Sequence, residues 1–125
     1  MTRDTPAVIS ELAPHEVFVF GSNGAGAHAG GAARYAVERF GAIWGQGEGL
    51  QGQSYAINTM SGLGVLEEQA TRFVAFAADH PELVFLVTEI GCGIAGYTPE
   101  QVAGYFAGAP SNVILPASFR RGSGS

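Results

Sequence analysis

The side chains of this chain that could do chemistry gather in two glycine-rich segments. The first places an amide and an imidazole among small residues: Gly21, Ser22, Asn23, Gly24, Ala25, Gly26, Ala27, His28, Ala29, Gly30 and Gly31. The second follows the carboxylate of Glu89: Gly91, Cys92, Gly93, Ile94, Ala95, Gly96 and Tyr97. Glycines let a backbone approach a ligand closely, and a helix that starts after such a loop adds unpaired N–H groups. Both segments therefore predict contact with a phosphate-bearing ligand.

Three side chains are candidates for catalytic roles, and each also has a structural alternative. Asn23 donates and accepts at once, which suits ribose hydroxyls, although asparagine also fills left-handed turn positions. His28 could touch a phosphate or act as an acid or base, or it is an exposed loop histidine without a task. Glu89 could act as a base, or its carboxylate caps a neighbouring backbone.

The second segment offers two further side chains of interest. Cys92, between two glycines, could be an exposed nucleophile, but no sequence pattern supplies a paired base. A small residue at a tight turn is the simpler interpretation. Tyr97 could stack on a ribose or a base, or it is an aromatic residue at the rim.

The elements that must position these residues alternate between strands and helices. Apolar runs predict strands, apolar residues at helical spacing predict helices, and a glycine-rich stretch at 45–52 predicts a loop. The expected strands are Val17–Phe20, Ser54–Thr59, Leu83–Val87 and Asn112–Leu115, and the expected helices are Gly31–Phe40, Val65–Asp79 and one from Pro99 to about Phe106. Gly41 should end the first helix, and Thr98 and Gln101 should cap the last.

This alternation predicts an α/β fold with three layers, in which helices cover both faces of a mostly parallel, four-stranded core sheet. The expected strand order is 4-3-1-2. Residues 1–14 would form an N-terminal arm with a helical turn, residues 15–119 the domain, and residues 120–125 a linker-like tail ending in Gly-Ser-Gly-Ser. Ligands of such sheets bind beyond the carboxyl ends of the strands, where both glycine segments would converge.

Composition excludes several classes of function. The formal charge is −5 with six arginines and no lysine, which argues against a nucleic-acid groove and against a Walker-type phosphate loop. A single cysteine gives neither an internal disulfide nor a CxxC metal pattern. We predict no metal and no cofactor. The chain has no apolar run of about 18 residues, and without a signal-like start a cytoplasmic location is expected.

The residues of both segments resemble those of macro domains, a family that binds ADP-ribose. The resemblance spans about residues 17–116 and rests on Val19-Phe20-Gly21-Ser22-Asn23, Gly30-Gly31-Ala32-Ala33 and Ile90-Gly91-Cys92-Gly93-Ile94-Ala95-Gly96-Tyr97. The family's N-terminal strands have no counterpart here, so the chain resembles a minimal version. The resemblance implies a Rossmann-like fold and a nucleotide site formed by the two glycine segments.

By this resemblance Asn23 would contact a ribose, Gly30 and Gly31 would approach the distal ribose and the diphosphate, and Gly93 to Gly96 would wrap the diphosphate, with Tyr97 alongside. Two departures matter. The acid that follows the glycine run in hydrolytic members is Ala33 here, and no acid replaces the one that usually reads adenine. The sequence thus favours binding of ADP-ribose, free or on a macromolecule, over hydrolysis of ADP-ribosyl linkages. The alternatives are a sensor or sequestering module for a nucleotide signal and a small Rossmann-like enzyme acting on another phosphorylated nucleoside.

Overall fold

The chain forms a five-stranded mixed sheet in the order β2-β3-β1-β4-β5. The computed structural model describes residues 4–6, 9–28, 31–92 and 95–122. The strands are β1 (Glu16–Ser22), β2 (Gly49–Gln51), β3 (Ser54–Asn58), β4 (Val84–Val87) and β5 (Val113–Ile114). β1 pairs in parallel with β3 and β4, and β4 pairs in parallel with β5, so the carboxyl ends of these four strands share one edge of the sheet. This confirms the expected α/β class.

The fifth strand corrects the expectation of a four-stranded sheet. β2 lies inside the glycine-rich stretch 45–52, which the sequence indicated as a loop, and it pairs antiparallel with β3. Gln51 faces Ser54 across a two-residue turn, in which Gly52 has a φ of +61°. A glycine at the first position of a two-residue turn is a known hairpin signal, because it accepts a positive φ without strain.

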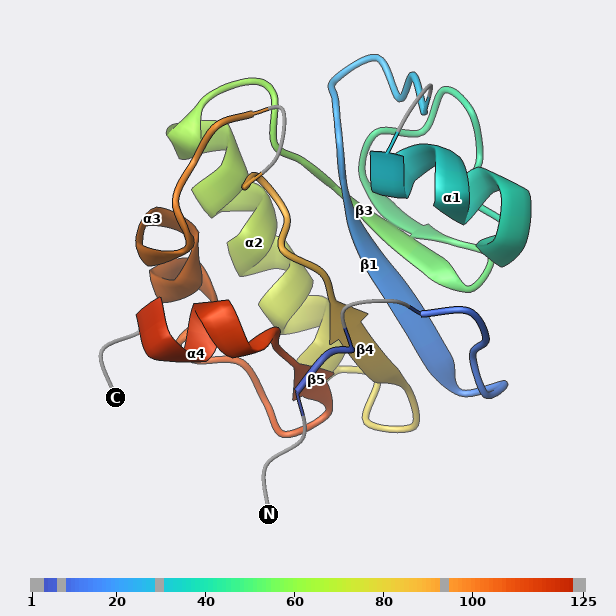
Figure 1. Cartoon of the computed structure of the whole chain (residues 1–125). Helices are drawn as coiled ribbons and strands as arrows, with labels where there is room; N and C mark the ends of the chain where they lie inside the picture. Colours follow the sequence, from blue (N-terminus) through green and yellow to red (C-terminus); the bar gives the residue numbers. More distant parts are fainter. Residues whose placement is uncertain (1–3, 7–8, 29–30, 93–94, 123–125) are drawn as a thin grey trace.

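Helices cover both faces of the sheet (Figure 1). α1 (Gly31–Phe40) lies on one face, and α2 (Leu63–Ala78), α3 (Pro99–Ala103) and α4 (Ala117–Gly122) lie on the other. A short 3-10 helix, η1 (Gly104–Phe106), continues α3. The apolar run in β1 serves both faces because side chains alternate along a strand. Phe18 and Phe20 pack in the α1-side core, whereas Val17 and Val19 pack in the α2-side core.

The predicted helix ends are confirmed where the sequence carried a local signal. α1 has the expected bounds, and Gly41 follows it with a φ of +78°, as a residue that ends a helix in the left-handed region should. At α3 the Thr98 hydroxyl accepts from the Gln101 backbone N–H while the Gln101 side chain accepts from the Thr98 N–H. This reciprocal pair is the capping box that the sequence predicted.

The described part of the N-terminal segment is hydrogen-bonded to the rest of the chain. The Thr5 N–H donates to Leu115 O at 3.0 Å, and the Tyr35 hydroxyl donates to Ile9 O at 2.6 Å. Residues 9–13 contain no helical turn. α4 continues past residue 119, so the expected domain boundary falls inside a helix. No helix in the described ranges is both long and apolar enough to cross a membrane.

Candidate functional site

A cleft of about 490 Å³ opens at the sheet edge where the parallel strands end, and we call it the strand-end cleft. Its lining comes from β1 and the following loop, from the first turn of α1, and from the segments after β3 and β4. The lining residues are Gly21, Ser22, Asn23, Ala27, Gly31, Ala32, Ala33, Thr59, Met60, Thr88, Glu89, Ile90, Gly91 and Ala95. The volume lies within the range of small-ligand sites.

Half of the lining was expected from the sequence and half was not. The cleft brings together these predicted residues: Gly21, Ser22, Asn23, Gly31, Glu89, Gly91 and Ala95. The predicted residues Gly24, Gly26, His28, Cys92, Gly96 and Tyr97 do not line it. The predicted contacts Gly30, Gly93 and Ile94 lie outside the described residues.

Asn23 lines the cleft, but its side chain also holds its own loop together. Its Oδ1 accepts from the Ala27 N–H at 2.9 Å, and its Nδ2 donates to Ala27 O at 3.1 Å. The amide thus uses one acceptor site and one donor within the loop. One N–H remains for a ligand, so only part of the expected ribose contact is left. The alternative of a left-handed turn position is wrong, because among the described residues only glycines have a positive φ.

His28 is buried, whereas both interpretations of the sequence expected an accessible side chain in the loop. It is 1% exposed, and its ring packs edge-on against Phe20 at a centroid distance of 5.2 Å. Its Nε2 lies 3.2 Å from Gln51 Oε1, and because an amide oxygen accepts, Nε2 is the donor of this hydrogen bond. Nδ1 has no hydrogen-bond partner among the described residues. A buried ring outside the cleft cannot serve there as the acid or base, so this expectation is corrected.

Glu89 does reach the strand-end cleft from the end of β4. Its Oε2 accepts a short hydrogen bond from the Ser118 hydroxyl on α4. Because a carboxylate has two oxygens, this bond orients the group and leaves the other oxygen available. Glu89 is the one ionisable side chain among the residues that line the cleft.

One of the predicted ligand-binding glycines, Gly26, is explained by packing between loops. A Cβ on Gly26 would lie 2.3 Å from the backbone carbon of Gly45, and one on Gly47 would lie 2.3 Å from Asn23 O. The Gly45 N–H donates to Gly26 O at 2.8 Å. The first glycine segment therefore rests backbone-to-backbone on the stretch that leads into β2.

In the second segment, Cys92 and Tyr97 serve the interior rather than the cleft. Both pack against the α2-side core, and the Tyr97 N–H donates to Gly91 O at 2.8 Å. Burial, and next the charges of Glu89 and Glu100, raise the pKa of the Cys92 thiol. The thiolate is disfavoured, so the prediction of a small residue at a tight turn fits better than a nucleophile.

The residues that the sequence analysis missed include two threonines at strand ends. Thr88 follows β4 and Thr59 follows β3, in positions like that of Ser22 at the end of β1. A hydroxyl side chain at the end of one parallel strand and directly after two others was a readable signal, because such positions meet at one edge of the sheet.

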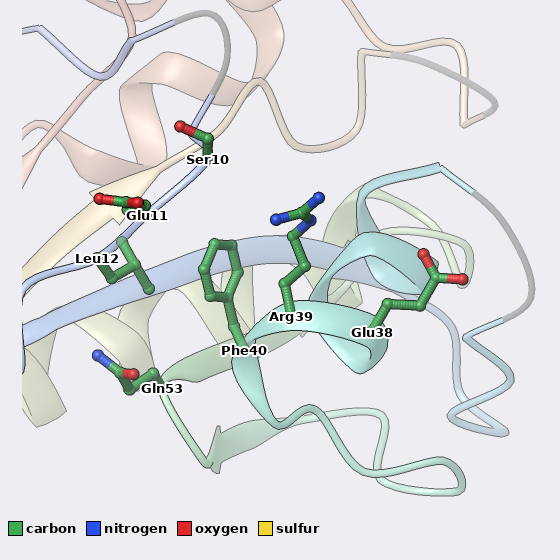
Figure 2. A pocket seen from close by; sticks show the side chains of 7 residues that line it. All are labelled: Ser10, Glu11, Leu12, Glu38, Arg39, Phe40 and Gln53. Carbon is green, nitrogen blue, oxygen red and sulfur yellow. The ribbon is translucent and has the colours of Figure 1, made fainter.

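A second hollow, of about 610 Å³, lies at the other end of α1 (Figure 2). Its lining joins the N-terminal segment to the end of α1 and to the β2–β3 turn: Ser10, Glu11, Leu12, Glu38, Arg39, Phe40 and Gln53. Two of its charged groups already have partners, since Glu38 pairs with Arg34 at 3.2 Å and Arg39 stacks over the Tyr35 ring. Although it is larger, it collects none of the residues of the two glycine segments.

A scan against protein-family models, a search of curated proteins and a search of solved structures returned no match to this chain. The resemblance to macro domains therefore stays a prediction. The described residues hold no group of three or more His, Cys, Asp or Glu side chains placed to bind a metal.

Proposed function

We propose that this chain binds ADP-ribose, or a related nucleotide containing ADP-ribose, in the strand-end cleft. One observation carries the proposal: the cleft joins residues of both glycine segments to the first turn of α1. A macro domain-like arrangement of the fold, with the four parallel strands in the expected order, is part of this proposal.

The first turn of α1 supports an anionic group in the ligand. Gly31, Ala32 and Ala33 open the helix and line the cleft, and their N–H groups have no acceptor within the helix. These N–H groups and the positive end of the helix dipole favour a phosphate. No lysine, arginine or histidine is among the lining residues, so the backbone supplies the positive potential for a diphosphate.

The same lining favours binding over hydrolysis. Ala33 stands in the cleft where the resemblance would place a catalytic acid. Asn23 uses one donor and the oxygen of its amide in hydrogen bonds with Ala27, and His28 is buried outside the cleft. A hydrolytic activity would depend on Glu89 as its base, and this is the second candidate function, favoured by the position of that carboxylate in the cleft.

Calorimetric titration with ADP-ribose, run beside an assay for release of ADP-ribose from a modified protein, tests the proposal. We expect binding heat without turnover. Turnover that disappears in Glu89→Gln would select the hydrolase, and a stronger response to AMP or NAD would select the Rossmann-like enzyme. No heat from ADP-ribose would contradict the proposal.

The variant Ala32→Glu separates binding from folding. Ala32 is exposed on the first turn of α1, where an acidic side chain stabilises a helix by about 0.3–1 kcal/mol. The same charge repels a phosphate, so we expect affinity for ADP-ribose to fall about tenfold or more while the melting temperature is kept. Ala75→Glu, at an exposed alanine near the far end of α2, is the control for added charge. Equal affinities of the two variants would contradict the assignment of the phosphate to α1.

A further inference from the structure

The face of the sheet that carries α1 is covered by two different elements. α1 packs mainly on β1 and β3. The core on this face also takes in side chains of β4 and β5: Val84, Leu86 and Ile114. Ile9 is 7% exposed in the same core, and Leu12 packs against it. We call Thr5 and residues 9–13 the N-terminal strap, because they extend the cover of this face beyond α1.

The strap also covers one edge of the sheet. β5 is the last strand in the sheet order, so its outer side has no strand beside it. Thr5 lies there, and its N–H and its hydroxyl donate to Leu115 O and Ile114 O, each at 3.0 Å. A strand with free carbonyls at the edge of a sheet accepts any extended segment that brings matching donors. Thr5 therefore fills a position that the same residue of another molecule could also fill.

Few contacts hold the rest of the strap. The Tyr35 hydroxyl donates to Ile9 O at 2.6 Å, and the Gln53 side chain donates to Ala13 O at 3.0 Å. Between residues 10–12 and the end of α1 lies the hollow of about 610 Å³ (Figure 2). A segment held by one buried aliphatic side chain and single hydrogen bonds opens more readily than packed helices and strands do.

A tight turn joins the strap to β1. The Glu16 N–H donates to Ala13 O at 2.9 Å, which closes a turn with Pro14 at its second position. The next residue, His15, is fixed to the sheet, because its O accepts from the Val84 N–H at 2.9 Å. The strap contacts described above do not depend on which molecule supplies the strap, whereas this turn does.

We propose that the strap site is an interaction surface for a second copy of this chain, and that two copies form a dimer by exchanging straps. The strap itself identifies the occupant: a hydroxyl residue for the β5 edge, Thr5, and an aliphatic residue four positions later, Ile9, for the core. Each contact is made again between the two chains, so exchange changes only the turn and the entropy of joining two molecules.

The wild-type chain gives the first test. A short tethered segment has an effective concentration on the order of 1 mM, so docking within one chain dominates below that concentration. We expect a monomer at about 10 μM and a dimer fraction after unfolding and refolding at about 1 mM. Size-exclusion chromatography with light scattering measures the mass of each species. A chain that refolds at about 1 mM without any dimer would overturn the proposal.

Deleting Pro14 gives the second test, because the shortened turn cannot close while the strap and its site are unchanged. The straps then dock only between chains. We expect a dimer already at about 10 μM, with a dissociation constant at least about 100-fold below that of the wild type. Inserting Gly-Gly after Pro14 is the matched control, which lengthens the turn and should leave a monomer at that concentration. A monomeric deletion variant would overturn the proposal.

The third test asks whether the dimer is held by the strap. Adding Ile9→Asp to the Pro14 deletion places a charge in the core, so the dimer should weaken at least about 100-fold. Ser10→Asp adds the same charge at the exposed neighbouring residue and should keep the dimer. A synthetic peptide with the sequence of residues 4–13 should convert the dimer into a peptide-bound monomer, and the same peptide with Ile9→Asp should not. A dimer that survives Ile9→Asp, or one that excess wild-type peptide leaves intact, would overturn strap exchange.

Discussion

Replacing Gly26 by alanine should unfold the first glycine segment, whereas the same change at Gly31 should not. Both residues have a positive φ, +67° and +59°, so alanine costs about 1–2 kcal/mol at either position. The surroundings differ. A Cβ on Gly26 would lie 2.3 Å from the Gly45 carbonyl carbon and 2.4 Å from Gln46 N, both of them backbone atoms. A Cβ on Gly31 would meet no heavy atom of the described residues within 4 Å.

The clash at Gly26 adds a loss of unfolding free energy that is absent at Gly31. Backbone atoms cannot rotate away as a side chain does, so two loops must move apart, and overpacking of this kind costs about 1–3 kcal/mol. We expect Gly26→Ala to lose about 2–5 kcal/mol of unfolding free energy and Gly31→Ala about 1–2 kcal/mol. For a domain of this size the melting temperatures should fall by about 10–20 °C and about 3–8 °C.

Thermal and denaturant unfolding of the two variants, followed by circular dichroism, measures the difference. Because Gly31 lines the strand-end cleft, Gly31→Ala should also weaken ADP-ribose binding more than its small loss of stability explains. Equal losses of unfolding free energy, within about 0.5 kcal/mol, would refute the argument that loop packing requires Gly26.

Three further predictions concern the helix cap at Thr98 and the burial of Tyr55 and Cys92. Thr98→Ala removes one half of the capping box at α3 and should cost about 1 kcal/mol in denaturant unfolding, whereas a loss below about 0.3 kcal/mol would contradict the cap. Burial raises the pKa of Tyr55 to about 12, so its phenol should ionise at a higher pH than a free tyrosine does in an ultraviolet titration. Because the unfolded chain loses that proton near pH 10, stability should fall as the pH rises above 10, and a stability independent of pH there would contradict the burial. The raised pKa of Cys92 should make its reaction with iodoacetamide at pH 8 slower than that of a free cysteine in the unfolded chain, and an equal rate would contradict the burial of the thiol.

Much of the fold could be predicted because its signals are local. The apolar run in β1 predicts a buried strand, and Gly41 and Thr98 mark helix ends through conformations and hydrogen bonds that involve only near neighbours. β2 was missed although the turn at Gly52 carries a hairpin signal. The strand has only three residues, and the glycines at 45, 47, 49 and 52 make the stretch typical of a loop. α4 was missed because its last residues, 120–122, fall in the segment that ends in the linker-like Gly-Ser-Gly-Ser.

The site was predicted less completely than the fold. Its place at the carboxyl ends of the strands follows from the order of the elements, and Asn23, Glu89 and Gly91 do line it. The sequence did not separate glycines that face the cleft from those that face another loop. Gly26 and Gly31 carry the same residue type and nearly the same φ, and only the position of Gly45 distinguishes them.

The sequence by itself determined the succession of the four parallel strands and of α1 to α3, the two glycine segments, and the edge of the sheet where they leave the strands. These depend on side-chain periodicity and on the preferences of single residues, which act over a few positions of the chain. Only the tertiary structure decided that His28 is buried beside Phe20 and Gln51, and that Ser118 reaches Glu89. Those contacts join residues 8 to 29 positions apart, and whether they form depends on how the loops and the last helix fold back over the sheet.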